Sequence, residues 1–124
     1  MRDFLAIAKA LGDQNRVRTV MAVKDGELCL CQIIDLLQPL APSTVSKHVS
    51  LLLQAGLLEL KKDGRWRYYR LPRGKTPPVV RDALRWALQS LNNDPVVDRD
   101  AKVLQVVRKK DLEELSTCYR SQAG

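Results

Sequence analysis

Apolar side chains recur at helical spacing through the first part of the chain and predict two helices there. The pattern covers residues 3–11 and resumes over residues 14–24. Gly12 ends the first helix, and Asp13 is a suitable N-cap for the second. An Asp25-Gly26 turn follows and separates these helices from the next segment.

Two shorter helical patterns come next, at residues 30–38 and 42–55, with a tight break at residues 39–42. Pro42 suits the first position of the second helix, where its missing N–H costs nothing. Gly56 caps the C-terminus of that helix. Two short helices joined by a tight turn are typical of a helix-turn-helix unit.

The hydrophobic period changes from helical to alternating over residues 57–71, which predicts a β-hairpin around Asp63-Gly64. The base of the hairpin is apolar and its tip is cationic, so we expect the base to pack on the core and the tip to be exposed. Such a hairpin after a helix-turn-helix unit is a wing. With a two-residue turn at Asp63-Gly64, the predicted cross-strand pairs are Lys62 with Arg65, Leu60 with Arg67 and Leu58 with Tyr69.

The rest of the chain is predicted to be helical. Residues 78–92 carry a wide apolar stripe, and residues 96–124 are amphipathic and hold one or two further helices. We therefore expect a mainly α fold with a small β-hairpin, a winged helix-turn-helix of order α-α-α-α-β-β-α plus a C-terminal helical tail. The DNA-binding and dimerisation domain spans residues 1–93, and the amphipathic tail spans residues 94–124.

Composition is that of an ordinary globular protein. The 124 residues allow one domain, with 45% hydrophobic and 28% charged residues. No apolar run approaches the ~18 residues of a membrane span. The N-terminus is a poor signal peptide, because Asp3 and Lys9 interrupt it. We expect a cytoplasmic protein with no membrane partner.

Positive charge is concentrated in one quarter of the chain. The formal net charge is +7, from 21 Lys and Arg against 14 Asp and Glu. Residues 42–73 hold seven of the basic residues and two of the acidic ones, a net charge of +5. A concentrated positive field favours a polyanionic partner, because neutralising phosphates releases counterions.

The predicted recognition helix and wing carry the side chains that would contact double-stranded DNA. The N-terminal residues of a recognition helix make the base contacts, and a cationic wing tip reaches the flanking backbone or minor groove. The alternative is a plain interaction module in which these residues form a solvated face. The predicted DNA contacts are Ser43, Thr44, Ser46, Lys47 and His48 on the helix, and Lys62, Arg65 and Arg67 on the wing.

Cys29 and Cys31 form a C-x-C pair at the predicted start of a helix. Residues two apart on a regular helix point about 200° away from each other, but an extended first residue lets both thiols face the same way. A helix N-terminus also lowers thiol pKa values, so the pair suits a soft, thiophilic ion. The alternatives are buried cysteines that act as small hydrophobes, or a redox switch. Cys118 is either a third ligand or a bystander on an amphipathic helix. Because His48 is the single histidine, a site built from several imidazoles is excluded.

Enzymatic function is not predicted. The chain has no C-x-x-C motif on a βαβ unit and no phosphate-binding loop. No organic cofactor is expected.

Three segments together resemble the ArsR/SmtB family of winged-helix metal-sensing repressors. They are LGDQNRVRTV (11–20), DGELCLCQIIDLL (25–37) and STVSKHVSLLLQAGLLELKKDGRWRYYRL (43–71). The ELCLC run resembles the ELCVC motif of the arsenical-repressor branch. The resemblance implies a homodimer, joined through the first helix and the 78–92 helix, that binds an inverted-repeat operator and releases it when an inducer binds.

The resemblance also implies that Cys29 and Cys31 are the inducer thiolates. Trivalent arsenic or antimony prefers three thiolates, and the best-known arsenical repressors carry the third cysteine one helical turn further on. That position is Ile34 here. Cys118 is therefore the candidate third ligand within the chain, and an exogenous thiol or a two-coordinate organoarsenical is the alternative.

We therefore expect a repressor of a metalloid-resistance operon that responds to As(III) or Sb(III). The alternative is a winged-helix repressor that senses cadmium, lead or thiol oxidation through the same pair. Zinc sensing is disfavoured because residues 78–93 contain no histidine. The cadmium and lead branch adds N-terminal cysteines, and no cysteine precedes Cys29 in this chain.

Overall fold

The computed structural model describes the backbone of residues 1–123 and the side chains of residues 1–120. This part of the chain forms seven helices and a three-stranded antiparallel sheet with strand order β1-β3-β2. The elements are α1 (Arg2–Ala10), α2 (Gln14–Ala22), β1 (Leu28–Cys29), α3 (Leu30–Leu36), α4 (Pro42–Gln54), β2 (Glu59–Asp63), β3 (Trp66–Arg70), α5 (Pro78–Ser90), α6 (Pro95–Val107) and α7 (Leu112–Ala123). The winged helix-turn-helix prediction is confirmed.

The helix-turn-helix unit consists of α3 and α4. Pro42 is at the start of α4, as predicted, and Gly56 follows its end with a φ of +80°. The Leu57 amide donates to the Leu52 carbonyl, and the Gly56 amide donates to the Leu53 carbonyl, both at 3.0 Å. These two bonds form a Schellman motif, which ends α4 and turns the chain into the wing.

The wing is the hairpin of β2 and β3, but its register differs from the prediction. Leu60 lies opposite Tyr69 and Lys62 opposite Arg67, so the two-residue turn is Gly64-Arg65 and the predicted turn was wrong. Gly64 has a φ of +60°, and glycine is favoured at the first central position of a type II′ turn. The faces of the hairpin stay as predicted, because Leu60 pairs with Tyr69 instead of Arg67, a shift of two residues, and side chains two apart on a strand lie on the same face.

The sheet has a third strand that the sequence pattern did not reveal. β1 pairs with β3, with Leu28 opposite Tyr69 and Cys29 opposite Tyr68. The wing is therefore joined through the backbone to the residue that precedes α3. Leu28 of this strand is among the largest fully buried side chains, together with Ile33, Leu37, Leu52 and Leu57.

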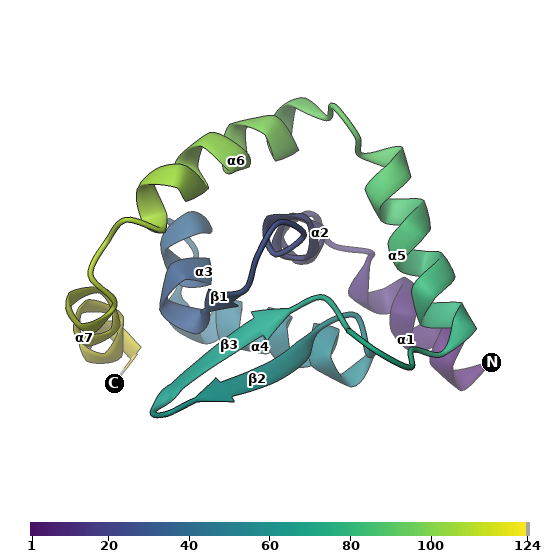
Figure 1. The fold of residues 1–124 in the computed structure, drawn as a ribbon, viewed down its shortest axis with the longest axis horizontal. Coiled ribbons are helices and arrows are strands. Elements are labelled where there is room, and N and C mark those ends of the chain that lie inside the picture. The colour runs from purple at the N-terminus through teal and green to yellow at the C-terminus, as the bar shows by residue number, and fades with distance from the viewer. Residues whose placement is uncertain (124) are drawn as a thin grey trace.

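Helices α1 and α5 lie side by side at one end of the molecule, and α7 lies at the other end beside α3 (Figure 1). Helix α6 connects the two ends by passing over α2 and α3. In the described residues, no helix is long and apolar enough to cross a bilayer.

The segment after residue 93 packs on the main core. Leu104, Leu115 and Tyr119 belong to the same buried cluster as the side chains of α3 and α4. A buried ion pair also holds α6 to α2, because Arg18 Nε lies 2.8 Å from Asp100 Oδ2 and Arg18 Nη2 lies 3.1 Å from Asp100 Oδ1. The predicted tail is thus two helices that form one body with residues 1–93.

Candidate nucleic-acid interface and thiol pocket

The first turns of α4 present small polar and basic side chains to solvent. Ser43, Ser46 and Lys47 are exposed, and Thr44 is half-buried. The N-cap residue is Ala41, which makes no side-chain cap. Pro42 has no amide hydrogen, and the Thr44 amide donates to the Ala41 carbonyl at 3.0 Å, so in this turn the Ser43 amide is the one that can face a phosphate at the helix N-terminus.

His48 lies differently from these four residues. Its side chain is 13% exposed, with Nδ1 3.1 Å from Arg16 Nη1 and Nε2 3.9 Å from Asp13 Oδ1. Asp13 also caps α2, since its Oδ1 accepts from the amides of Asn15 and Arg16. This placement favours a role for His48 in joining α4 to α2 over the predicted DNA contact.

The wing tip carries the three predicted cations, but one of them is engaged within the chain. Lys62 and Arg67 are exposed and face each other across the two strands. Arg65 pairs with Glu113 of α7, and its guanidinium lies 5.0 Å from the centroid of the Trp66 ring. Helix α7 therefore holds Arg65, while Lys62 and Arg67 are exposed and take part in none of the ion pairs that the structure describes.

The thiol pair lies where α3 begins, as predicted. Cys29 is the N-cap residue, with φ −79° and ψ 165°, and Cys31 is in the first turn. The extended backbone at Cys29 brings both thiols together, and they are hydrogen-bonded to each other. Gln32 closes a capping box, because its Oε1 accepts from the Cys29 amide at 2.9 Å and its own amide donates to the Cys29 sulfur.

The two thiols differ in acidity. The hydrogen bond from the Cys31 thiol, against the opposing effect of burial, lowers the pKa of Cys29 to about 7, and the amides at the start of α3 contribute to this. The same hydrogen bond, together with burial and the charge on Cys29, raises the pKa of Cys31. Near neutral pH the pair therefore readily loses one proton. The negative charge lies on Cys29, and the Cys31 thiol keeps its proton.

Alkylation of Cys29 tests this acidity. In a Cys118→Ser background, we expect the rate of carbamidomethylation at Cys29 to rise between pH 6 and 8, with its half-maximum near the pKa of about 7. Cys31→Ala removes the donor thiol, which is the largest cause of the lowered pKa of Cys29. The half-maximum should therefore move up toward the ordinary pKa of 9.0. Peptide mass spectrometry over a pH series measures both rates. A half-maximum near pH 9 with the intact pair would contradict the hydrogen-bonded arrangement.

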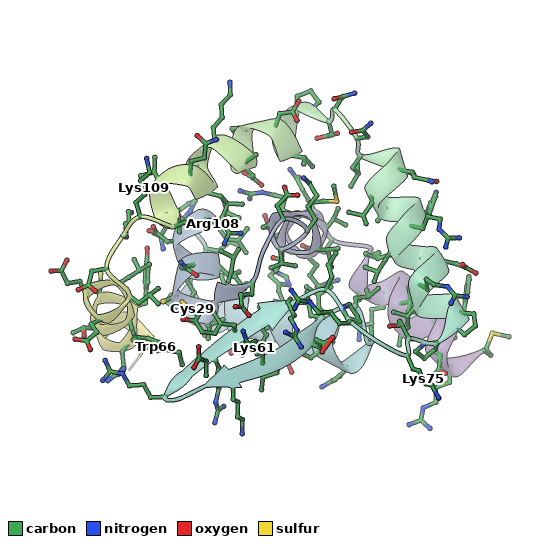
Figure 2. The ribbon with its side chains drawn as sticks, in the orientation of Figure 1. Cys29, Lys61, Trp66, Lys75, Arg108 and Lys109 are labelled. Atoms are coloured by element: carbon green, nitrogen blue, oxygen red, sulfur yellow. The ribbon has the colours of Figure 1, made fainter. Side chains whose placement is uncertain are left out.

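A cavity of about 520 Å³ opens beside the thiol pair, between the wing and α7. In Figure 2, Cys29 and Trp66 lie toward the end of the sheet that α7 approaches. The walls come from three elements, the start of α3, the wing tip and α7. The lining residues are Cys29, Leu30, Cys31, Ile34, Arg65, Trp66, Arg67, Glu113, Ser116, Thr117, Tyr119 and Arg120.

Asp35 of α3 anchors the helix that forms the outer wall. Its carboxylate accepts a 2.6 Å hydrogen bond from the Tyr119 hydroxyl and lies 2.7 Å from Lys110 Nζ. Burial, together with the bond to Asp35, raises the pKa of Tyr119, so its hydroxyl remains a neutral donor. Sequence reasoning missed Asp35, Trp66, Tyr119 and Arg120 as parts of the site. The amphipathic pattern of residues 96–124 predicted helices there but did not indicate the element on which they pack.

Cys118 is not part of the cavity wall. It is exposed on α7, while Thr117 and Tyr119 on either side of it line the cavity. Within the residues that the structure describes, no three His, Cys, Asp or Glu side chains are grouped to hold a metal ion. The structure thus brings Cys29 and Cys31 together and leaves Cys118 outside the pair.

Comparison with known proteins gives consistent matches to one family. Residues 13–59 match the family model described as "Bacterial regulatory protein, arsR family". "Arsenic resistance transcriptional regulator ArsR2" of Pseudomonas putida is 33% identical over 85 residues, which are 68% of this chain and 72% of the relative. "Arsenic resistance transcriptional regulator ArsR1" of the same organism is 37% identical over 75 residues, which are 57% of this chain and 58% of the relative.

Other matches extend the range of relatives. "Cadmium resistance transcriptional regulatory protein CadC homolog" of Staphylococcus aureus is 33% identical over 70 residues, which are 56% of this chain and 57% of the relative. A solved structure described as "Possible transcriptional regulator for arsenical resistance" superposes with a TM-score of 0.53 at 27% identity, covering 85% of this chain and 97% of that one. These relatives are transcriptional regulators and not enzymes.

Proposed function

This chain belongs to the ArsR family of bacterial transcriptional regulators, and we propose that it is the homodimeric repressor of a metalloid-resistance operon. In this proposal the protein binds operator DNA and releases it when trivalent arsenic or antimony binds the thiolates of Cys29 and Cys31. The hydrogen-bonded thiol pair at the start of α3 carries the proposal.

The exposed surface of α4 and the wing supports operator binding. Ser43, Ser46 and Lys47 lie at the N-terminal end of α4, and Lys62 and Arg67 lie on the exposed face of the wing. A helix of this kind fits the major groove with its first turns toward the bases, and basic side chains beside it neutralise phosphates. Two copies related by a two-fold axis would read an inverted repeat with half-sites one helical turn apart.

The chemistry of the pair supports a soft inducer. Thiolates select soft ions, and Cys29 is already poised to lose its proton near neutral pH. Binding at Cys29 acts on two elements at once, since this residue begins α3 and pairs with Tyr68 of the wing. Displacing either element disturbs the surface that faces DNA.

Operator release measured by fluorescence anisotropy tests the proposal. Arsenite and antimonite should each release a labelled inverted-repeat operator, and cadmium or lead should do so less effectively at the same concentration. A coupling of ~1–3 kcal/mol corresponds to a 5- to 150-fold weaker operator affinity. Release by cadmium or lead alone would contradict the assigned inducer.

Thiol oxidation is the second candidate, and the acidity of Cys29 favours it. The Cys29 thiolate would attack hydrogen peroxide to give a sulfenic acid, and the Cys31 thiol would then displace water to form a disulfide. The overall change consumes two thiols and one peroxide and yields one disulfide and two waters. Operator release by peroxide, with a mass loss of two hydrogen atoms and no response to arsenite, would favour this candidate.

Exposed apolar side chains on α1 and α5 support a homodimer. Phe4 and Leu5 on α1 are 62% and 54% exposed, and Trp86 on α5 is 68% exposed. The two helices pack on each other at one end of the molecule (Figure 1), so their exposed residues belong to the same end. An exposed apolar surface on one end of a small protein is typical of an interface between subunits.

Trp86→Ala should weaken the dimer by about 30-fold or more, because a tryptophan at the centre of an interface contributes about 2 kcal/mol or more. Val106→Ala is the matched control, since Val106 is 61% exposed on α6, away from α1 and α5. Sedimentation equilibrium of the two variants and the parent measures the effect. A parent chain that is monomeric at micromolar concentration would refute the assignment.

A further inference from the structure

The cavity beside the thiol pair offers two sulfur ligands and much more room than a metalloid ion fills. Of the three cysteines in the chain, Cys29 and Cys31 line it and Cys118 does not. Its volume of about 520 Å³ compares with roughly 30 Å³ for a water molecule in the liquid. A trivalent metalloid held by two cysteines has one bond left for a ligand from outside the chain, and the cavity has space for a small organic molecule there.

The charge of the cavity indicates what kind of molecule fits. Three arginines line it, and Glu113 is the one carboxylate among its described lining residues. Glu113 pairs with Arg65. Among the ion pairs that the structure describes, none includes Arg67 or Arg120. Two guanidinium groups beside a pair of thiols suit a ligand that carries carboxylates as well as sulfur.

We propose that the third ligand of the bound metalloid is a small thiol that carries carboxylates, with its sulfur on the metalloid and its carboxylates on Arg67 and Arg120. This inference rests on the proposed function, because it concerns the inducer of the same thiol pair. With arsenite, three As–S bonds form, to Cys29, to Cys31 and to the small thiol. Three As–O bonds break, and the three thiol protons leave with the three hydroxyl groups as water. Arsenic stays trivalent, so the step needs no oxidant or reductant.

Contacts between α7 and α3 place Arg120 on the cavity wall. The neighbouring Tyr119 donates to Asp35 of α3, and Arg120 Nη2 lies 3.2 Å from Ser116 Oγ within the helix. Helix α7 therefore carries Arg120 on a cavity wall that is attached to α3. Trp66 and Ile34 also line the cavity and supply apolar surface, which suits the carbon frame of the small thiol.

Arsenic X-ray absorption and native mass spectrometry test the inference on the full chain. The Cys118→Ser variant removes the chain's own alternative third ligand. With arsenite and glutathione, we expect three sulfur ligands on arsenic and a mass of one arsenic plus one glutathione per protomer. With arsenite alone, we expect two sulfurs and one oxygen. Glutathione, which carries two carboxylates, should be retained about tenfold more tightly than the neutral thiol 2-mercaptoethanol, as expected for charge-assisted hydrogen bonds.

Arg120→Gln in the same background should abolish the preference for glutathione, and Arg120→Lys should keep part of it. Equal retention of the two thiols, or an unchanged preference in Arg120→Gln, would overturn the inference. If arsenic binds with two sulfurs and one oxygen, and the operator is released regardless of added thiol, this inference fails and the proposed function stands. If arsenic does not bind Cys29 and Cys31 under any condition, the proposed function itself fails.

Discussion

Cys29→Ser should bind the operator as the parent does and should not release it when arsenite is added. Cys29 is the N-cap of α3, and its sulfur accepts a hydrogen bond from the Gln32 amide. Serine is a favoured N-cap residue and accepts the same bond with its hydroxyl oxygen, so α3 should keep its start. The substitution removes one of the two thiolates and with it the metalloid site, while the surface of α4 and the wing is unchanged.

We expect Cys29→Ser to abolish the entire response to the inducer. Saturating arsenite should lower the operator affinity of the parent 5- to 150-fold, for a coupling of ~1–3 kcal/mol. The operator affinity of Cys29→Ser should stay within about twofold of its arsenite-free value. Fluorescence anisotropy with a labelled operator gives both numbers. Cys31→Ser, at the second residue of α3, should behave in the same way. If Cys29→Ser releases the operator like the parent, the pair is not the inducer site.

Operator affinity should fall about 10³-fold when salt rises from about 50 to about 200 mM. The exposed cations that face DNA in the proposed complex are Lys47, Lys62 and Arg67, which gives six in a dimer. Six phosphate contacts predict a slope of log affinity against log salt of about −5. Arg65 is left out of this count because it pairs with Glu113. A slope near −7 would mean that Arg65 leaves α7 and contacts DNA as well.

Lys47→Ala should make this slope shallower by about 2, because the dimer loses two phosphate contacts. Lys102→Ala is the matched control, since Lys102 is an exposed lysine on α6, outside the proposed interface. Its slope should equal that of the parent. A slope that does not change in Lys47→Ala would remove α4 from the DNA contacts.

Local signals in the sequence were sufficient for the winged helix-turn-helix. Pro42 marks the start of α4 because it lacks an amide hydrogen, and Gly56 marks its end because it adopts a positive φ. Only the end of a helix accommodates either property. The C-x-C pair was also placed correctly, since its chemistry depends on one extended residue before α3. These features depend on neighbours in the chain, and the sequence pattern reports such neighbours directly.

Other features depend on contacts between distant residues. Strand β1 has only two residues, too few for an alternating pattern, and it exists because β3 pairs with it. The wing turn was predicted one residue too early, because both Asp63-Gly64 and Gly64-Arg65 contain the glycine and the choice depends on which central position takes the positive φ. The outer wall of the cavity depends on Asp35, which Tyr119 contacts from 84 positions further along the chain.

Thiol counting during operator release tests the central claim most directly. The claim is that one metalloid per protomer binds Cys29 and Cys31 and thereby releases DNA. In the Cys118→Ser variant, arsenite should protect both remaining thiols from a thiol reagent in step with the loss of operator anisotropy, with equal midpoints. Release with both thiols still reactive, or protection of both thiols without release, would contradict the account.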